Sequence, residues 1–420
     1  MRLAWDIVCV LLATGWVALA LVAVLANRRH ATRFLPTGYP PADYFPPVTL
    51  ITPIKGIDRD LPGCIASLCN QNYPDYRVII VLESKYDPAF AVVTRELAAH
   101  PHRASQVMIA GSAGIHEGQK VHNQLHVLRT IEPGARDDEV WAFADSDAVP
   151  GPNWLATLVG RLKLETVGVT TGYRWIVPEE SAPTVGSRHE PGSDFWTGIA
   201  SVVNASVACA YRSHHRDQAW GGAMAMHVGV ARKGRLIDRL TGALTDDYPI
   251  TRMARDLKLD VRYLPACLAA TPANFTFASL FAFARRQYII TRVYSPGIYA
   301  LALASLSAWL LGMAAAWSHL LVNVLRDAGD WRSWLCVPAV VLVPIFNQFR
   351  AAYRRQSVER AFGAAMLQRL RLALVIDRWL TPFWMAMHWL FAASALFARS
   401  FTWRGIRYRL DGPNQVTRVG

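Results

Sequence analysis

The segment Glu139-Val-Trp-Ala-Phe-Ala-Asp145-Ser-Asp147 joins an apolar run to two carboxylates that are separated by one residue. The run has the length and composition of a buried strand, and α/β sheets place their ligands at the carboxyl ends of such strands. Carboxylate oxygens suit Mg²⁺ or Mn²⁺, and a cation held there could neutralise a diphosphate. The segment therefore predicts a metal site at Asp145 and Asp147. The alternative is a solvated turn, because the Asp-x-Asp pattern is common.

The flanking sequence, from Val48 to about Pro272, alternates short β-branched runs with amphipathic segments. The expected strands are residues 48–52, 77–82, 106–109, 139–144 and 167–171. The expected helices are residues 61–70, 88–100, 120–131 and 153–164. This alternation of strand and helix predicts an α/β fold with a mostly parallel sheet.

The composition indicates that part of the chain lies in a membrane. Of the 420 residues, 52% are hydrophobic and 18% are charged, whereas a soluble domain has about 25% charged residues. The net charge is +13, and from Arg350 onward twelve arginines stand against three acidic residues. These arginines flank apolar runs, which is typical of cytoplasmic membrane borders, so no nucleic-acid partner is expected. The six cysteines form no Cys-x-x-Cys pair, which indicates free thiols in a reducing compartment.

The amino-terminal region has the pattern of a membrane anchor. Residues 7–26 form an uninterrupted apolar run that is long enough to cross a bilayer. Arg28 and Arg29 follow this run, whereas a signal peptide carries its positive charge in front of it. We expect an uncleaved transmembrane anchor over residues 1–30, with the next residues in the cytoplasm. A proline-rich linker over residues 36–47 would follow the anchor.

The final third of the chain predicts a second membrane region. Its apolar runs are residues 298–325, 334–349 and 379–397, and a basic amphipathic segment lies between the last two. Pro382 and His388 interrupt the last run and arginines flank it on both sides, so we expect it not to cross the bilayer fully. The expected divisions are residues 273–297 as an amphipathic interface segment, 298–400 as a membrane region and 401–420 as a cytoplasmic tail.

Two further acidic positions suggest a catalytic site. In Leu244-Thr-Asp246-Asp247-Tyr248, a carboxylate could take the proton of an acceptor hydroxyl, and a helix that begins there would favour its ionised form. The alternative is helix capping, and one aspartate could cap while its neighbour acts as the base. Glu83 ends the expected strand 77–82, where an acid can bind a ribose or a base edge or can simply be solvated.

Two basic motifs could bind a phosphorylated ligand. Lys120 and Asn123 follow a segment with three glycines, at positions 111, 114 and 118, that would let a sugar nucleotide approach closely. Arg286, Gln287 and Arg292 lie on the amphipathic segment before the second membrane region. Arginines there could hold a pyrophosphate, or they could contact lipid headgroups.

Glu83, Asp145 and Asp247, in this order and at these intervals, resemble the three acidic positions of inverting GT-A glycosyltransferases. Within this superfamily the chain is similar to the ceramide glucosyltransferase-like branch, and its tail, Thr402-Trp-Arg-Gly405 with Tyr408, is similar to that of bacterial members. The resemblance covers roughly residues 1–330. Its local motifs are Ile54-Lys-Gly56, Asn70-Gln-Asn-Tyr-Pro74, Asp87-Pro-Ala89, Lys120-Val-His-Asn123, Ala144-Asp-Ser146, Gly221-Gly-Ala-Met-Ala-Met226 and Asp246-Asp-Tyr248.

The resemblance implies a GT-A domain over residues 48–272, a Mg²⁺ or Mn²⁺ ion, a UDP-sugar donor and a lipid acceptor. The first expectation is transfer of glucose from UDP-glucose to ceramide in a bacterial inner membrane, with the catalytic domain facing the cytoplasm. The alternatives are a hopanoid or diacylglycerol acceptor, a UDP-amino sugar donor and, in another class, a nucleotide-binding transport or scaffold protein. The implied roles are catalysis by Asp247, donor binding by Glu83, Lys120, Asn123, Asp145, Arg286, Gln287 and Arg292, metal binding by Asp145 and Asp147, and acceptor contact by Asp246, Gly222 and Met224.

Two positions depart from the family pattern. The first acidic position is usually Asp and is here Glu83. The family's (Gln/Arg)-x-x-Arg-Trp motif falls near Arg286, which places Ile289 and Ile290 where Arg and Trp are expected. Arg292 and Tyr294 are candidate substitutes for these two residues. The loss of the Trp argues against a processive polysaccharide synthase, which uses it in the acceptor channel.

Overall fold

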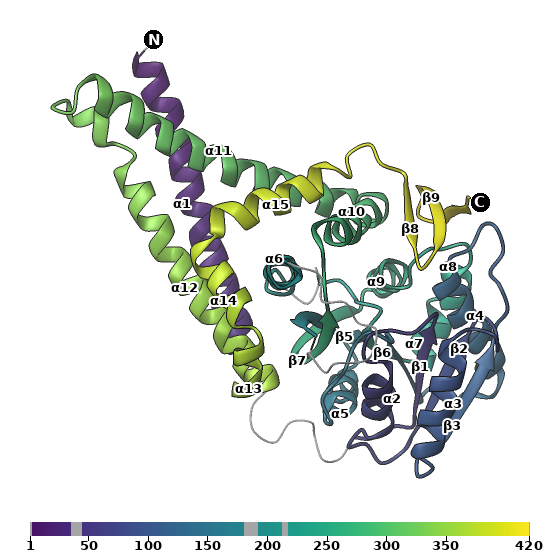
Figure 1. Cartoon of the computed structure of the whole chain (residues 1–420). Helices are drawn as coiled ribbons and strands as arrows, with labels where there is room; N and C mark the ends of the chain where they lie inside the picture. Colours follow the sequence, from purple (N-terminus) through teal and green to yellow (C-terminus); the bar gives the residue numbers. More distant parts are fainter. Residues whose placement is uncertain (1, 35–43, 180–191, 212–216, 420) are drawn as a thin grey trace. The chain divides into compact units, whose positions relative to one another are not determined.

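The computed structural model describes residues 2–34, 44–179, 192–211 and 217–419 (Figure 1). The chain forms two compact units. The first, called here the sheet unit, comprises Arg33–His189, Tyr211–Asn274 and Arg399–Gly420. The second, called the helical unit, comprises Met1–Thr32, Glu190–Ala210 and Phe275–Ala398. Most of the predicted linker at 36–47 lies outside the described residues.

The sheet unit contains a seven-stranded sheet in the order β3-β2-β1-β4-β6-β5-β7. The strands are β1 Val48–Ile54, β2 Tyr76–Leu82, β3 Ser105–Ile109, β4 Val140–Ala144, β5 Val167–Pro178, β6 Ala223–His227 and β7 Asp260–Ala273. Neighbouring strands are parallel from β3 to β4 and between β5 and β7, and only β6 runs antiparallel to its neighbours. The predicted α/β fold with a mostly parallel sheet is confirmed.

Helices cover both faces of this sheet because residues along its central strands alternate between two apolar clusters. Leu50 and Ile80 belong to the cluster on the face of α2 (Leu61–Cys69), α3 (Ala89–Ala99) and α5 (Trp154–Gly160). Ile51 and Ile79 belong to the cluster on the face of α4 (Gln119–Ile131), α8 (Leu236–Leu240) and α9 (Asp247–Asp256). The short helix α7 (Val228–Lys233) follows β6. Burial on both faces is the usual condition of parallel strands.

The second half of the sheet differs from the prediction. Strands β6 and β7 were not expected, and β5 is longer than the predicted residues 167–171. Gly172, one residue beyond the predicted end, lies inside β5. A Cβ atom at Gly172 would lie 2.1 Å from the Cys267 carbonyl oxygen, so glycine here allows β5 and β7 to approach closely.

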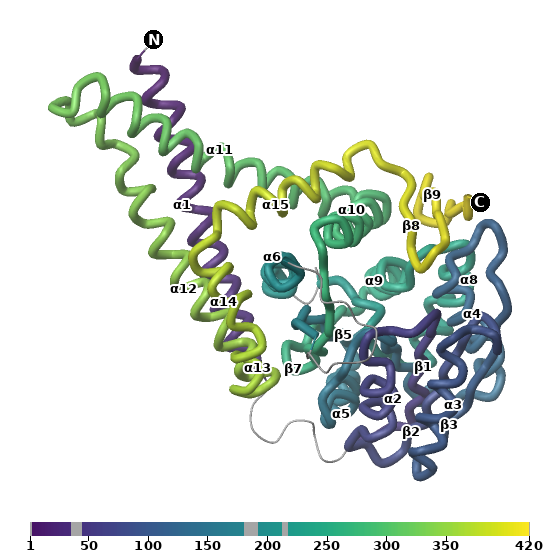
Figure 2. Tube along the Cα trace, viewed as in Figure 1, coloured from purple at the N-terminus to yellow at the C-terminus, as the bar shows by residue number. Residues whose placement is uncertain are grey.

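Residues near the carboxyl terminus form a small sheet that belongs to the sheet unit. Figure 2 draws this segment as the yellow end of the tube. Its antiparallel strands are β8 Ser400–Trp403, β9 Ile406–Gly412 and β10 Gln415–Arg418. The buried Tyr408 hydroxyl accepts a hydrogen bond from the Gln119 backbone N at 3.3 Å, and the Arg418 backbone N donates to the Ile115 carbonyl at 2.7 Å. Residues 401–420, predicted as a separate tail, therefore pack against the start of α4 and the segment that precedes it.

Among the described residues, the helical unit has three helices that are long and apolar enough to cross a membrane. They are α1 (Arg2–Thr32), α11 (Pro296–Arg326) and a third segment, Trp331–Phe362, that includes α12 (Val337–Phe362). Helix α1 packs against α11 and α12. A Cβ atom at Gly312 of α11 would lie 2.6 Å from the Trp16 Cβ of α1, so glycine permits this close packing. The predicted runs 7–26 and 298–325 lie within α1 and α11, whereas the predicted run 334–349 is part of a longer helix.

Shorter helices complete the helical unit. They are α6 (Ser193–Ala208), α10 (Phe277–Tyr294), α13 (Ala364–Arg369), α14 (Arg371–Trp379) and α15 (Thr381–Ala393). Helix α6 lies within the residues predicted as the GT-A domain, but it packs on α14 in the helical unit. A buried ion cluster fixes α14 to α12, because Asp377 accepts hydrogen bonds from Arg350 at 3.0 Å and from Arg354 at 2.8 Å. All six cysteines of the chain are free and buried.

The fold makes a prediction about membrane topology. Because the small carboxyl-terminal sheet and the residues before α10 belong to one unit, the chain must return to the side of the membrane that it left. Two crossings by α11 and α12 satisfy this condition. Helix α15 has 13 residues and is about 20 Å long, which is short of the roughly 30 Å hydrocarbon core.

We therefore expect cysteines introduced by Gln415→Cys and Tyr86→Cys to react with a membrane-impermeant maleimide from the same side of sealed vesicles. Both positions are exposed, and the native cysteines are buried. Labelling of the two variants from opposite sides would show that α15 crosses the membrane.

Candidate active site

The candidate site lies where four parallel strands end at one edge of the sheet. Lys55 follows β1, Glu83 follows β2, Ser112 lies shortly after β3 and Asp145 follows β4. Parallel strands place their carboxyl ends together, and this edge is where open α/β sheets bind ligands. The sequence predicted Glu83 and Asp145 at this edge from the strand pattern alone.

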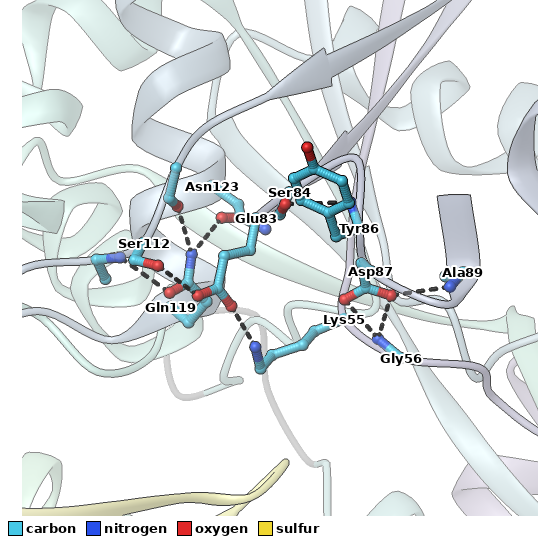
Figure 3. Close-up of polar contacts among 12 residues, drawn as sticks. Lys55, Gly56, Glu83, Ser84, Tyr86, Asp87, Ala89, Ser112, Gln119 and Asn123 are labelled. Atoms are coloured by element: carbon cyan, nitrogen blue, oxygen red, sulfur yellow. Dashed lines mark hydrogen bonds and ion pairs between the residues drawn. The ribbon is translucent and has the colours of Figure 1, made fainter. Parts of the chain in front are cut away.

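Glu83 is held by two donors from neighbouring strand ends (Figure 3). It forms an ion pair with Lys55 and accepts a hydrogen bond from Ser112 Oγ at 2.6 Å. Burial raises the pKa of Glu83, but the hydrogen bonds from Lys55 and Ser112 and the charge of Lys55 outweigh burial and lower it. Asp87 fixes the backbone beside Lys55 by accepting a hydrogen bond from the Gly56 N at 3.0 Å. Glu83 is therefore an ordered carboxylate rather than a freely solvated acid.

Asn123 is a buried residue of α4 that supports the surroundings of Glu83 from the interior of the protein. Its side chain is 1% exposed, and its Oδ1 accepts a hydrogen bond from Gln119 Nε2 at 2.8 Å. Gln119 Nε2 also donates a hydrogen bond to the Gly111 carbonyl at 3.0 Å, so the pair links α4 to the glycine-bearing segment. This burial gives Asn123 a positioning role, and direct donor contact by Asn123 stays a prediction.

Lys120, in the first turn of α4, links two of the predicted acidic residues. Its Nζ lies 2.7 Å from Asp145 Oδ1 and 3.1 Å from Asp246 Oδ1. Burial disfavours the charged ammonium, but Asp145 and Asp246 outweigh that effect and raise the pKa of Lys120. The lysine therefore remains a cation and brings the end of β4 together with the start of α9.

Asp246 and Asp247 differ sharply in their surroundings. Asp246 is 1% exposed, and its second oxygen accepts a hydrogen bond from Gln124 Nε2 at 2.6 Å. It occupies the N-cap position of α9 but its side chain makes no capping hydrogen bond, so helix capping is wrong for Asp246. Asp247 Oδ1 accepts hydrogen bonds from Thr245 Oγ1 at 2.7 Å and from the Tyr248 N at 2.8 Å. Asp247 Oδ2 has no hydrogen-bond partner among the residues that the structure describes.

The ionisation of Asp247 also differs from the expectation. Burial, followed by the charge of Asp246, raises the pKa of Asp247 to about 6, although Thr245, Lys120 and Tyr248 act in the opposite direction. The helix start does not give this carboxylate a low pKa, contrary to the prediction. A pKa near 6 leaves Asp247 ionised at neutral pH and makes it a stronger base than an ordinary aspartate.

Asp147 has the features of an incomplete metal site. Its Oδ1 is buried and has no hydrogen-bond partner in the described part of the chain, and Arg174 Nη1 lies 3.9 Å from its Oδ2. Burial and, second, the charge of Asp145 raise the pKa of Asp147 to about 6. A carboxylate in this state would gain from a bound cation.

The described residues contain no group of three or more His, Cys, Asp or Glu side chains arranged for a metal. Mg²⁺ commonly binds one or two carboxylates and completes its shell with substrate phosphates and water.

Two adjacent glycines make room for this carboxylate group. A Cβ atom at Gly221 would lie 2.3 Å from Asp246 Oδ1, and one at Gly222 would lie 2.8 Å from Asp145 Oδ2. Gly222 therefore lies beside Asp145, as an acceptor-side residue could. Met224 is fully buried in the apolar core, and acceptor contact by Met224 stays a prediction.

The predicted basic residues of α10 belong to the helical unit. Arg292 Nη2 donates a hydrogen bond to the Ala398 carbonyl at 2.6 Å, and the Arg286 guanidinium lies over the Phe283 ring. Ile289 and Ile290 are buried where the family motif has Arg and Trp. Donor binding by Arg286, Gln287 and Arg292 stays a prediction.

Sequence reasoning missed several charged residues of the site. Lys55, Asp58, Arg174 and Arg404 all lie within or beside it. Arg404 comes from the small carboxyl-terminal sheet and forms an ion pair with Asp58. The alternation of apolar and charged residues from Ile406 to Asp411 was the available signal for this sheet.

Comparison with known proteins shows the family to which the chain belongs. Residues 9–416 match the family described as glycosyl transferase family 21. The chain belongs to this family. Ceramide glucosyltransferase of Komagataella phaffii is 36% identical over 61 residues, which are 14% of this chain and 12% of that protein. Ceramide glucosyltransferase of Gibberella zeae is 32% identical over 137 residues, which are 30% of this chain and 24% of that protein. The aligned segments thus span a quarter or less of these relatives.

Solved structures of glycosyltransferases are also similar to this family 21 chain. A mannosyltransferase from Pyrobaculum calidifontis, in complex with GDP-Man and Mn²⁺, has 17% identity and a TM-score of 0.46, with 90% of this chain and 99% of that chain covered. Glucosyl-3-phosphoglycerate synthase from Mycobacterium tuberculosis has 14% identity and a TM-score of 0.36, with 59% and 78% covered.

The family match confirms the predicted enzyme class and the resemblance to ceramide glucosyltransferases. The relatives named above are fungal, whereas the sequence analysis expected a bacterial branch. The organisms of these relatives say nothing of the origin of this chain, so the bacterial part stays a prediction.

The state of Asp147 makes a prediction about stability. We expect Mn²⁺ with UDP to raise the thermal unfolding midpoint of the wild-type protein but not that of Asp147→Asn, because a cation relieves the unfavourable charge of Asp147. Without metal, Asp147→Asn should unfold at or above the wild-type temperature, since it removes that charge. Asp138→Asn is the matched control, because Asp138 is exposed and paired with Arg136. An equal Mn²⁺ effect on Asp147→Asn and the wild type would contradict metal binding by Asp147.

Proposed function

We propose that the chain is a membrane glycosyltransferase that transfers a sugar, glucose from UDP-glucose in the first instance, to a lipid hydroxyl by one inverting displacement. The observation that carries this proposal is the contrast between two adjacent carboxylates. Asp246 is fully engaged by Lys120 and Gln124, whereas Asp247 keeps one oxygen without a partner among the described residues. A base for an acceptor hydroxyl needs such an oxygen.

The donor would bind along the carboxyl edge of the sheet. Glu83 lies at the end of β2, where an ordered carboxylate can bind a ribose or a base edge. Asp145 and Asp147 would hold Mg²⁺ or Mn²⁺, which when bound neutralises charge on the departing diphosphate. Lys120 keeps Asp145 in place through its 2.7 Å ion pair and stabilises the negative charge of the site.

The acceptor would lose its proton to Asp247 as its oxygen attacks the anomeric carbon. The raised pKa of Asp247, to about 6, strengthens it as a base while leaving it ionised at neutral pH. The hydrogen bonds from Thr245 and Tyr248 fix the other oxygen of the same carboxylate, so the unpaired oxygen has a defined direction. A general base of this kind typically contributes about 10²- to 10⁴-fold to the rate.

A lipid acceptor fits the architecture of the chain. The three membrane-length helices would hold the enzyme at a bilayer, where a ceramide hydroxyl is available. Ceramide is the first expectation, because the relatives named above are ceramide glucosyltransferases. The alternatives are a hopanoid or a diacylglycerol as the acceptor, or a UDP-amino sugar as the donor. The arginines near the membrane segments favour a catalytic unit that faces the cytoplasm. A bacterial inner membrane was predicted on the bacterial resemblance alone and is not part of the proposal.

Lipid mass spectrometry of a heterologous host tests the proposal. Expression of the chain should add the mass of one hexose to a single lipid class, which identifies the sugar class and the acceptor together. Asp247→Asn is the matched control and should form at least about a hundredfold less product. The absence of any glycosylated lipid in a host that supplies UDP-glucose and ceramide would contradict this donor and acceptor.

The two aspartates should give different phenotypes. We expect Asp247→Asn to lower turnover by about 10²-fold or more with UDP binding nearly unchanged, because it keeps the shape of the side chain but removes its basicity. Asp246→Asn should weaken UDP binding as well, since it removes a charge partner of Lys120. Turnover numbers and UDP dissociation constants measured for both variants test this. Turnover within tenfold of wild type in Asp247→Asn would exclude Asp247 as the base.

The raised pKa of Asp247 predicts the acid limb of the pH profile. Protonation removes the base, so kcat/KM should fall as the pH drops through about 6, rather than near the ordinary aspartate value. Thr245→Val removes a hydrogen bond that favours the ionised form, so the acid limb should move to higher pH. An acid limb that is unchanged in Thr245→Val would argue that another group controls it.

A further inference from the structure

The turn between β8 and β9 places an arginine in an unusual backbone conformation. Trp403 pairs with Ile406, so Arg404 and Gly405 form a two-residue hairpin loop. Their φ angles are 52° and 77°, and positive φ at both positions is what a type I′ turn requires. Asn-Gly and Asp-Gly are the preferred sequences of such turns, whereas arginine is disfavoured at positive φ. The presence of Arg404 at this position therefore costs backbone strain, and its result is a guanidinium at the tip of the hairpin.

Asp58 fixes the orientation of the Arg404 guanidinium. Its Nη2 donates to Asp58 Oδ1, and Asp58 Oδ2 in turn accepts a hydrogen bond from Ser146 Oγ at 2.5 Å. Ser146 is the residue between the two carboxylates of the predicted metal site. The hairpin tip is thus connected through two hydrogen bonds to the loop that carries Asp145 and Asp147.

Part of the guanidinium remains available to a ligand. The Arg404 side chain is 36% exposed, and its Nε and Nη1 donate no hydrogen bond to any residue that the structure describes. Burial lowers the pKa of Arg404, but the charge and the hydrogen bond of Asp58, followed by the charges of Asp147 and Asp145, outweigh burial and raise it, so Arg404 remains a cation. Free N–H donors of a fixed guanidinium match the paired oxygens of a phosphate.

We propose that Arg404, presented by the β8–β9 turn, binds the diphosphate of the nucleotide-sugar donor and stabilises the charge of the leaving group. Asp58 acts as the positioning residue that aims it. This inference rests on the proposed function, because it assumes a nucleoside diphosphate as the leaving group. It assigns to the carboxyl-terminal sheet a direct part in donor binding.

The test uses Arg404→Asn in the full-length detergent-solubilised protein. This variant creates Asn-Gly, the preferred pair for the turn, so the fold should be as stable as wild type or more stable. Isothermal titration in the presence of Mn²⁺ compares UDP, uridine and inorganic pyrophosphate as probes. We expect Arg404→Asn to weaken UDP and pyrophosphate at least tenfold and uridine less than twofold. Arg407→Ala, which removes an exposed positive charge from the same sheet, should change none of them by more than twofold.

The possible outcomes separate this inference from the proposed function. Wild-type affinity of Arg404→Asn for UDP and pyrophosphate would overturn the inference, and so would an equal loss for uridine and UDP, which would indicate a structural role. Failure of the wild-type protein to bind UDP would contradict the proposed donor, while pyrophosphate would still report on Arg404. An unfolding midpoint for Arg404→Asn well below wild type would show that the arginine mainly stabilises the hairpin, and would also overturn the inference.

Discussion

The Lys120 ammonium lies between Asp145 and Asp246, and the rest of the site depends on this ion pair. Carboxylates gathered at one edge of a sheet repel one another, and a cation between them is what allows them to remain close. Lys120 stands in the first turn of α4, so the position of this helix sets the distance between the end of β4 and the start of α9. Glycines at 118, 221 and 222 allow that approach, because a Cβ atom at any of them would lie within 3 Å of a neighbouring atom.

Two carboxylates of the site, Asp147 and Asp247, are only partly compensated by neighbouring donors, and these are the predicted metal ligand and the proposed base. Asp246 has a partner for each oxygen, whereas Asp147 and Asp247 each keep an oxygen without a hydrogen-bond partner among the described residues, and burial raises the pKa of both. Such carboxylates are costly in the folded protein unless something binds them. This cost favours binding roles over structural ion pairs: Asp147 would bind a cation and Asp247 would bind a proton.

The local pattern of apolar residues was sufficient to predict the strands before residue 145 but not all of the strands after it. The parallel strands before residue 145, and the acids that follow them, could be predicted because apolar runs and strand ends are local features. The strand predicted over residues 167–171 continues past Gly172, where it lies against Cys267, a residue that is far away in sequence. Asn123 and Met224 were taken for ligand contacts because residue type does not reveal burial. Arg404 was missed as a site residue because its ion pair with Asp58 joins residues that are 346 positions apart.

The position of β8 and β9 in the chain has a consequence for biosynthesis. These strands are translated after the three membrane-length helices described above, and yet they pack on the sheet unit, whose main strands were made long before. A ribosome that has released residues 1–398 has therefore produced all the acids of the site without the hairpin that contacts Asp58. If the hairpin contributes to donor binding, the nascent enzyme stays inactive until the membrane segments have been synthesised. Catalysis would then begin only after the membrane segments have been made and β8 and β9 have folded onto the sheet unit.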